Sequence, residues 1–523
     1  MDLLSNHLQN RRRLHRLSRR YTFLLSAVVG GVAGLVAVLY QSFVQLISSA
    51  ELKTAQIIPQ DWWWLPGVLA PLGALLAWGA FRLAARYAPE SSGSGIPHTK
   101  AVLLGMRSLR PVNLLAAKFL GGLLALGAGL SLGREGPTVH MGAASAGWLC
   151  DKIHVPHRTR SNLIAAGAGA GLAAAFNAPL AGFLFIMEEL RREMSRVTYG
   201  SALVSTVTAV AVARLFLGQG NSFGLREVAP VELRQFPTVL LVAVVASLIG
   251  IVFNRGILGL LERKKGLPVT AGGYAALVGS VGMLLFCWCT PLTGGGHFLT
   301  HSALSGEMRY GLGGMALLLV VKLIFTILSY ATGVPGGLFA PILTLGALTG
   351  YLCGTLLGIW LPALTPAPQI LATVGMAAVL TSSVRTPLTG VVLIVEMTGQ
   401  YNLLYALLFG AWFAYMVAEY FGDQPIYEAL LHRDLNVRQQ HWKKEETRAV
   451  EVLVESHSEL EHLPLSRFPH HDDLLVVLLE RDGEVKIPHG STVVQAGDLI
   501  TLLVGPHMPE KELTLFLEKA RDA

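Results

Sequence analysis

Gly133-Arg134-Glu135-Gly136-Pro137-Thr138 places a carboxylate between two glycines within a long apolar stretch. The flanking runs, 112–132 and 139–149, contain only one lysine and one histidine as ionisable groups. An acid is costly in such surroundings and usually has a function. The glycines let the backbone open and bring bare N–H groups near a ligand, and the proline suits the first turn of a new helix. We therefore expect a broken helix whose N-terminal end faces a small anion, with Glu135 at the anion's position. A capping glutamate paired with Arg134 is the alternative.

The composition predicts that this stretch lies in a membrane. Of 523 residues, 52% are hydrophobic and 14% are charged, and the mean hydropathy is +0.51. A soluble globular protein has about 25% charged residues. These values predict a polytopic membrane protein. The four cysteines lie in apolar surroundings without paired metal-ligand spacing, so we expect free core cysteines and neither disulfides nor a metal site.

The net charge of +7 is concentrated near the N-terminus. Residues 1–20 hold one aspartate and six arginines, namely Arg11, Arg12, Arg13, Arg16, Arg19 and Arg20. Because cytoplasmic flanks of membrane spans are rich in Lys and Arg, this basic segment predicts a cytoplasmic N-terminus, and nucleic acid is not expected as a partner. The apolar run 21–47 is too long for the apolar core of a cleaved signal peptide.

Apolar segments follow along the chain, and several are too long for one span yet are interrupted by Gly or Pro. A perpendicular span needs about 20 residues, so these segments predict pairs of short or tilted helices in an all-α transport domain over 21–442. They lie near 21–49, 63–86, 111–132, 160–190, 200–217, 236–261, 268–290, 313–331, 336–361, 369–398 and 403–421. The clearest breaks, 93–97, 133–137 and 333–341, are the candidate ion site.

An internal repeat supports this interpretation. Pro179-Leu180-Ala181-Gly182 and Pro387-Leu388-Thr389-Gly390 each lead to an acid nine residues after the proline, Glu188 and Glu396, which we expect to hold structure. Two further proline motifs, 136–137 and 340–341, each precede a Gly-Ala pair at the same distance. Doubled membrane units with the binding site at the repeat interface are typical of transporters, which predicts halves of about 21–217 and 236–430.

The character of the chain changes after Trp442, because the last 81 residues contain 25 charged side chains. Their pattern predicts a small soluble α+β domain over 443–523. Strands are expected at 449–455, 474–480, 484–487 and 498–504, with a turn at Asp482-Gly483 and a helix over about 509–519. A domain of this size is marginal alone, so we expect it to pack against a twin or the membrane domain.

Over about residues 21–430 the chain resembles the CLC chloride channel and transporter family. Four segments resemble its chloride-site elements, in family order: Gly93-Ser94-Gly95-Ile96-Pro97, Gly133-Arg134-Glu135-Gly136-Pro137, Gly336-Gly337-Leu338-Phe339-Ala340-Pro341 and Gln424-Pro425-Ile426-Tyr427. The resemblance implies a two-half inverted-repeat fold with broken helices, a homodimer with one ion path per subunit, and cytoplasmic termini. The tail resembles the C-terminal ligand-binding domain of potassium-transport regulators (RCK_C or TrkA-C type) more than paired CBS domains.

The resemblance also implies a chloride site. Ser94 would offer a hydroxyl and Tyr427 a phenol to a dehydrated chloride, and the backbone N–H groups of Leu338 and Phe339 would complete the shell. Neutral donors suit an ion that must leave again. The alternatives are a helix N-cap role for Ser94 and an interfacial aromatic role for Tyr427.

Two acids carry the proposed proton chemistry. Glu135 resembles the gating glutamate of the family: ionised it would occupy an anion site, and protonated it would swing aside. The inner glutamate of the exchanger branch, which takes protons from the cytoplasm, corresponds to Glu189. Glu189 therefore favours proton-coupled exchange, and a passive chloride channel is the alternative. Another explanation of Glu189 is a helix-end acid paired with Arg191, Arg192 or a nearby lysine.

One departure from the family follows the 96–97 turn, where His98 and Lys100 stand at positions at which prokaryotic relatives often carry acids. These two basic side chains make the electrostatic potential near the turn more positive, but the four chloride-site motifs are unchanged. The fluoride-selective branch of the family tends to alter the proline-containing motif and the tyrosine. This chain has Pro137 and Tyr427, so the resemblance favours chloride over fluoride.

The expected protein is therefore a Cl⁻/H⁺ antiporter of a bacterial inner (plasma) membrane, with several spans in contact with membrane lipid. Chloride and protons are its expected cargo, its tail is expected to take a small ligand of unknown identity, and no cofactor is expected. The sequence has no His-Glu-x-x-His motif, and we do not expect an enzyme. A membrane-anchored sensor without transport is a more distant alternative.

Overall fold

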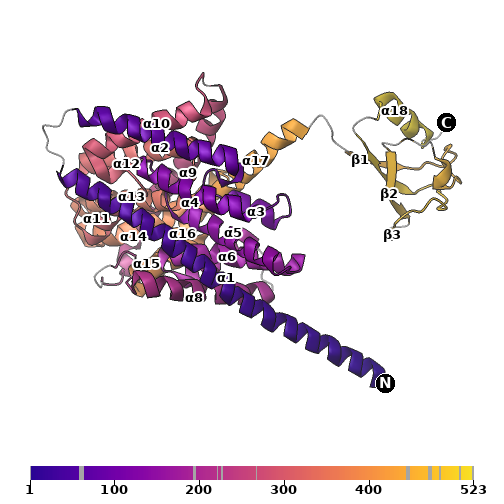
Figure 1. Ribbon diagram of the computed structural model, residues 1–523, viewed down its shortest axis with the longest axis horizontal. Coiled ribbons are helices and arrows are strands. Elements are labelled where there is room, and N and C mark those ends of the chain that lie inside the picture. Colours follow the sequence, from indigo (N-terminus) through magenta and orange to yellow (C-terminus); the bar gives the residue numbers. More distant parts are fainter. Residues whose placement is uncertain are drawn as a thin grey trace. The chain divides into compact units, whose positions relative to one another are not determined.

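The computed structural model describes residues 2–57, 64–191, 196–220, 222–224, 228–266, 268–442, 448–468, 471, 474–481, 484–505 and 508–520. The chain forms two compact units, Met1–Leu431 and His432–Ala523. The regular elements described in the first unit are helices, and the second contains an antiparallel sheet (Figure 1).

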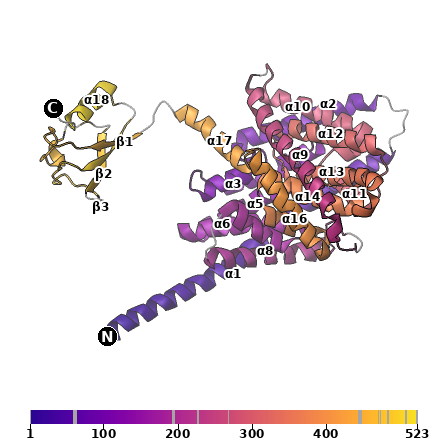
Figure 2. The same ribbon diagram turned by 180° about the vertical axis from the view of Figure 1, so that it is seen from behind.

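The helical unit repeats an arrangement of long, short and broken helices (Figure 2). Its first half comprises α1 (Asp2–Ile57), α2 (Leu65–Tyr87), α3 (Ile96–Leu103), α4 (Pro111–Gly127), α5 (Glu135–Lys152), α6 (His157–Phe176), α7 (Pro179–Phe185) and α8 (Arg196–Leu217). The second comprises α9 (Phe236–Arg263), α10 (Ala271–Cys289), α11 (His297–Ser305), α12 (Leu312–Ala331), α13 (Phe339–Trp360), α14 (Pro368–Val384), α15 (Pro387–Thr398), α16 (Leu404–Tyr420) and α17 (Ile426–Trp442). Helix α1 continues without a break through the basic segment into the first apolar segment.

Eight helical runs among the described residues are long and apolar enough to span a membrane. They are Tyr21–Ala50, Leu65–Tyr87, Thr198–Leu217, Leu233–Arg263, Ala271–Ser305, Leu312–Ala331, Phe339–Trp360 and Tyr401–Tyr420. The expected broken helices are confirmed: the segment 160–190 forms most of α6, then α7 and a π-helical turn at Ile186–Arg191, and 369–398 forms α14 and α15. The four cysteines are free; Cys150 is buried as a core residue, whereas Cys287, Cys289 and Cys353 are only half-buried.

The internal repeat extends to backbone conformation. Asn177 after α6 and Arg385 after α14 both have left-handed backbones, with φ of 57° and 69°, and they are 208 positions apart. Such a conformation is unusual for a residue other than glycine. Both residues end a helix immediately before a proline-initiated one, so the two halves break their helices by the same local device.

Glycines bring α5 and α13 close to the helices that follow them. A methyl group on Gly142 of α5 would overlap the backbone of Gly167 in α6, and one on Gly346 of α13 would overlap Gly375 in α14. Without a strong hydrophobic force between helices in lipid, such close backbone contact supplies much of the packing energy. These contacts fix the two helices whose N-terminal ends carry the candidate site.

Two acids cap helices of the opposite half. The Glu188 carboxylate accepts hydrogen bonds from the N–H groups of Leu388 (3.1 Å) and Thr389 (2.7 Å) at the start of α15, and from Thr389 Oγ1 (2.6 Å). Reciprocally, Glu396 accepts from the N–H groups of Leu180 (3.1 Å) and Ala181 (2.8 Å) at the start of α7. Negative charge at a helix N-terminus is stabilising, so both acids join the halves together.

We expect Glu188→Gln and Glu396→Gln each to destabilise the membrane unit by about 1–3 kcal/mol, because an amide cannot accept from two N–H groups through two anionic oxygens. Glu188→Gln should have the larger effect, since it also loses the Thr389 hydroxyl. Thermal unfolding in detergent measures the loss, and the ratio of protons to chloride moved should stay unchanged. A changed ratio would assign either acid to the transport path.

The second unit contains a four-stranded antiparallel sheet in the order β1-β4-β2-β3, with α18 (Glu510–Lys519) after the last strand. The strands are β1 (Arg448–Leu453), β2 (Leu474–Arg481), β3 (Glu484–Lys486) and β4 (Leu499–Val504). They agree with the predicted strands to within two residues at each end. The predicted turn at Asp482-Gly483 lies outside the described residues.

Asp498 and Arg481 form a bidentate ion pair in this unit. Arg481 donates from Nε and Nη2 to the two Asp498 oxygens at 2.7 and 2.6 Å, and the Gln495 N–H donates to Oδ2 at 2.8 Å. Burial alone would raise the pKa of Asp498, but these bonds outweigh it and lower the pKa below its usual value. The stabilisation is therefore present above the unfolded-state pKa and is lost as the pH falls through the folded-state pKa.

We predict that Asp498→Asn speeds hydrogen exchange of the β2 and β4 amides in the full-length protein at pH 7, because Arg481 loses its counter-charge. The difference from the wild type should begin to shrink below about pH 4, where an aspartate in the unfolded chain becomes protonated, and should vanish once the pH falls below the lowered folded-state pKa of Asp498. Glu484→Gln is the control, because its 3.9 Å contact with Lys486 is exposed. Equal protection in Asp498→Asn and the wild type at pH 7 would contradict this assignment.

Candidate ion-binding site

Backbone hydrogen bonds join the three predicted loops into one cluster. Gly93 N–H donates to Val334 O at 3.1 Å, and Gly336 N–H donates to Gly93 O at 2.9 Å. Gly133 and Gly337 exchange two bonds of 2.7 and 2.8 Å. Segments separated by more than 200 residues are thus held side by side, as the motif prediction required.

The cluster places helix N-termini around a common centre. Helices α3, α5 and α13 begin directly after these loops, and the first N–H groups of a helix have no partner within it. Close approach explains the glycines: a Cβ on Gly136 would lie 2.9 Å from Gly337 Cα and 3.0 Å from Ser94 O. The exposed N–H groups and helix dipoles favour a small anion here.

Two fully buried lysines stabilise the loops, a role the sequence interpretation missed. Lys118 Nζ donates to Ser91 O (2.8 Å) and Gly93 O (2.5 Å). In the other half Lys322 Nζ donates to Leu292 O and Gly294 O, both at 2.8 Å. The two lysines are 204 positions apart, the same separation as the Gly-Pro and Ala-Pro motifs, and that separation is the signal that could have identified them.

The predicted chloride ligands are buried at this centre. Ser94 is 1% exposed and Tyr427 is fully buried, as are Leu338 and Phe339 at the start of α13. Ser94 Oγ accepts from the Ile96 N–H at 3.2 Å, which leaves its hydroxyl hydrogen for another acceptor. Tyr427 Oη has no hydrogen-bond partner among the described residues. An anion between the two hydroxyls would satisfy both donors.

Glu135 is fully buried in the first turn of α5, and neither carboxylate oxygen has a hydrogen-bond partner among the described residues. The nearest basic groups are Arg134 Nε at 3.8 Å and His297 Nε2 at 3.7 Å from Oε1. Both distances are too long for hydrogen bonds. The geometry thus lacks the tight Arg134 pairing of the alternative interpretation, and it adds His297, which the motifs did not indicate.

Glu189 is 1% exposed and forms a 2.7 Å ion pair with Lys100 Nζ, whose side chain is 7% exposed. Arg191 instead donates to Ser161 and Asn162, and Arg192 lies outside the described residues. Glu189 is therefore paired, as its alternative explanation required, but through a lysine that replaces a usual family acid. His98, the other unusual residue, contacts His140 through ring nitrogens 3.0 Å apart.

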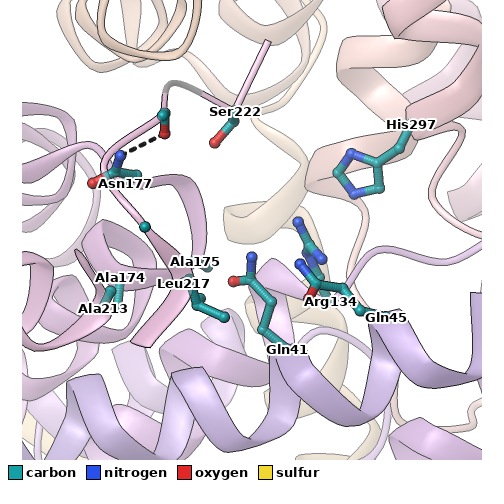
Figure 3. Close-up of a pocket in the computed structure, with 12 residues that line it drawn as sticks. Gln41, Gln45, Arg134, Ala174, Ala175, Asn177, Ala213, Leu217, Ser222 and His297 are labelled. Atoms are coloured by element: carbon teal, nitrogen blue, oxygen red, sulfur yellow. Dashed lines mark hydrogen bonds between the residues drawn. The ribbon is translucent and has the colours of Figure 1, made fainter. Parts of the chain in front are cut away.

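A cavity of about 290 Å³ is lined by Arg134 and His297 (Figure 3), the two residues whose basic groups lie nearest the Glu135 carboxylate. Gln41 and Gln45 of α1 line it together with Arg134, Asn177 and His297. Arg134 and His297 extend toward the cavity from different elements (Figure 3). A single side chain, that of Arg134 or His297, therefore separates the polar cavity from the buried Glu135 carboxylate.

One serine matches a hydrolase motif without the matching geometry. Ser131 lies in a Gly-x-Ser-x-Gly spacing at 129–133. It is fully buried, its Oγ shares a 2.7 Å hydrogen bond with Thr326 Oγ1, and its N–H donates to Ser329 Oγ. Its hydrogen bonds go to hydroxyls, and not to the histidine that a serine nucleophile uses.

Two helical repeats whose broken helices meet around buried hydroxyls and a buried carboxylate without a described hydrogen bond define a membrane protein of the ion-transport class. The profile of the voltage gated chloride channel family matches residues 73–419, and the TrkA-C domain profile matches residues 449–508. The chain belongs to the voltage gated chloride channel family and carries a TrkA-C domain. The resemblance inferred from the motifs is thereby confirmed.

Curated relatives and solved structures agree. The H(+)/Cl(-) exchange transporter ClcA of Vibrio cholerae is 38% identical over 425 residues, which cover 79% of this chain and 89% of that protein. ClcA of Cronobacter sakazakii is 35% identical over the same shares. The crystal structure of a slow cyanobacterial Cl-/H+ antiporter is 33% identical, with a TM-score of 0.75, and covers 79% of this chain and 98% of that one. A CLC-type fluoride/proton antiporter at 23% identity and TM-score 0.64 shares the fold.

Proposed function

We propose that this protein exchanges chloride for protons across a membrane, with Glu135 alternating between an anion-like ionised state and a protonated state that releases the path. Ser94, Tyr427 and the N–H groups of Leu338 and Phe339 bind the dehydrated chloride. Glu189 receives protons from the opposite side of the site. The relatives named as H(+)/Cl(-) exchange transporters support this activity.

The observation that carries the proposal is the Glu135 carboxylate at the start of α5, which has no hydrogen-bond partner among the described residues. Because a buried charge is costly without partners, a static structural acid would be expected to have hydrogen bonds. The same helix ends that attract chloride stabilise the ionised carboxylate, so the two anions compete for one place. Protonation removes the charge and lets chloride take that place. This competition links chloride movement to proton movement.

Proton uptake into liposomes containing the purified protein tests the exchange. A chloride gradient is imposed with no other driving force, and the proton movement is recorded with a pH electrode. We expect protons to move uphill against their own gradient. Chloride movement without proton movement would overturn the exchanger and leave a channel.

A passive chloride channel is the second candidate, and the Lys100–Glu189 ion pair favours it. The Lys100 ammonium occupies the Glu189 carboxylate at 2.7 Å, so an incoming proton must first displace that contact. If the pair stays closed, the inner proton route is interrupted and only chloride passes. The liposome experiment separates the two candidates.

The placement and assembly of the protein follow from the same family. We infer a multi-pass protein of a bacterial inner membrane, with the basic N-terminal segment and the tail in the cytoplasm, working as a homodimer with one ion path per subunit. Retention of Pro137 and Tyr427 supports chloride over fluoride as the cargo. We propose the domain limits that the composition indicates, namely a transport domain over 21–442 and a soluble domain over 443–523.

The tail over 443–523 is proposed to regulate transport by binding a small ligand or by pairing with its twin. The TrkA-C match supports a regulatory domain there. Deletion of these residues should change chloride flux or its response to added nucleotides and ions in liposomes. If flux and every response stay as in the full-length protein, regulation is not the role of the tail.

A further inference from the structure

We propose that His297 is a proton relay between Glu135 and the cavity beside it. This inference rests on the proposed proton transfer at Glu135 and adds the residue that connects this acid to water. The observations are the position of the imidazole, its access to the cavity, and the absence of an equivalent group in the other half of the molecule.

His297 stands between the buried carboxylate and the cavity. Its Nε2 lies 3.7 Å from Glu135 Oε1, the carboxylate is fully buried, and the histidine side chain is 40% exposed. The imidazole also lines the cavity (Figure 3). A catalytic hydrogen bond is often longer in the resting state than during transfer, so a small rotation of either side chain brings the two groups into contact.

The equivalent helix start in the first half of the chain shows that a histidine is not needed to begin α11. Gly296 before α11 and Gly95 before α3 both have a φ of 84°, and Thr300 and Thr99 donate to their carbonyl oxygens in the same way. The position that follows the glycine is Ile96 in the first half and His297 in the second. The helix start is thus built equally well with an apolar side chain, so the imidazole is not needed for the turn.

Neighbouring side chains hold the His297 imidazole in place and leave it accessible to the cavity. Phe223 stacks on the imidazole with ring centroids 5.7 Å apart and an interplanar angle of 29°. The charged groups that face His297 are Glu135, Arg134 and Lys322, and the last of these already donates to two backbone carbonyls. Helices α13 and α14, which pack against α11, contain no Asp, Glu, Lys or Arg. Glu135 is therefore the carboxylate with which this imidazole exchanges protons.

The transfer balances in both directions. Protonated Glu135 gives its proton to the Nε2 lone pair, which leaves a carboxylate and an imidazolium. The imidazolium then releases a proton from its other nitrogen to cavity water, and exchange with water restores the starting tautomer. Proton uptake by Glu135 reverses these steps, so no other reactant is needed.

Chemical rescue tests the relay. We expect His297→Ala in liposomes to lower coupled turnover about 100-fold at neutral pH, the lower end of the effect of a lost general acid–base group, and added imidazole to restore most of it. Turnover of His297→Ala should also lose the pH dependence contributed by the histidine. His301→Ala is the matched control, because His301 is an exposed histidine on the same helix.

The outcomes separate this inference from the proposed function. Wild-type protein that moves no protons would overturn the exchanger itself. Wild-type exchange with unchanged turnover and pH profile in His297→Ala would overturn the relay alone. Chloride binding by His297→Ala, measured by calorimetry, should match that of the wild type. Such a match shows that the variant folds. In a Glu135→Gln background, His297→Ala should leave chloride flux unchanged; a further change would mean that the imidazole acts on the chloride path and not on the proton.

Discussion

Glu135→Gln is expected to abolish proton coupling while chloride still crosses the membrane. The amide has nearly the shape of the acid but carries no charge and cannot bind or release the proton. It therefore resembles the protonated, open state of the gate permanently. We expect chloride-driven proton flux to fall at least about 100-fold.

The structure indicates that this substitution is tolerated. Among the residues that the structure describes, Glu135 has no hydrogen-bond partner that the amide would lose, and the two nearest basic groups lie beyond hydrogen-bond distance. Replacing a buried charge by a neutral isostere removes a desolvation cost. The melting temperature should therefore equal or exceed that of the wild type, which makes a loss of coupling attributable to the missing proton site.

Parallel recordings with chloride and pH electrodes on the same liposomes measure the effect. Glu396→Gln is a matched control, since it also removes an acid of the membrane unit, but a half-buried one that caps α7. Uphill proton movement that persists in Glu135→Gln would remove this residue from the gate.

Glu189→Gln is expected to retain chloride flux and to lose most proton movement. The inner route would then lack its carboxylate, while the Ser94 and Tyr427 ligands are unchanged. The ion pair complicates the experiment, because removing one partner of a buried pair costs roughly 3–5 kcal/mol. Lys100 would be left without its carboxylate, and a destabilised protein could lose activity for that reason alone.

A double-mutant cycle with Lys100 resolves this difficulty. Lys100→Gln, Glu189→Gln and the double variant are compared for unfolding temperature, chloride flux and proton flux. We expect the double variant to recover stability but not proton flux, and Lys100→Gln to keep proton flux with an altered pH profile. Recovery of proton pumping in the double variant would show that the ion pair, and not the carboxylate, had been disturbed.

The positions at which the helices break were predictable from the sequence because the signals for a break are local. A glutamate between glycines in an apolar run is improbable unless the backbone opens there, and the structure indeed starts α5 at Glu135. Broken helices were predictable for the same reason, since a run such as 160–190 is too long for one span and contains prolines. The strands of the tail followed from alternating apolar residues bounded by turn residues.

Side-chain partners were not predictable, because they depend on contacts between distant segments. Lys100 was recognised as unusual, but its pairing with Glu189 brings together residues 89 positions apart. His297 carries no motif and lies 162 positions from Glu135. Reciprocal capping by Glu188 and Glu396 likewise appears only when α7 and α15 lie side by side.

The sequence by itself determined the membrane class, the doubled architecture and the positions at which helices break, because hydrophobicity, glycine and proline act on the chain within a few residues. Only the tertiary structure decided which charges meet. Buried ionisable groups take partners from whatever element the fold places against them, so the loose Arg134 contact, the closed Lys100–Glu189 pair and the imidazole beside Glu135 are properties of the packed molecule.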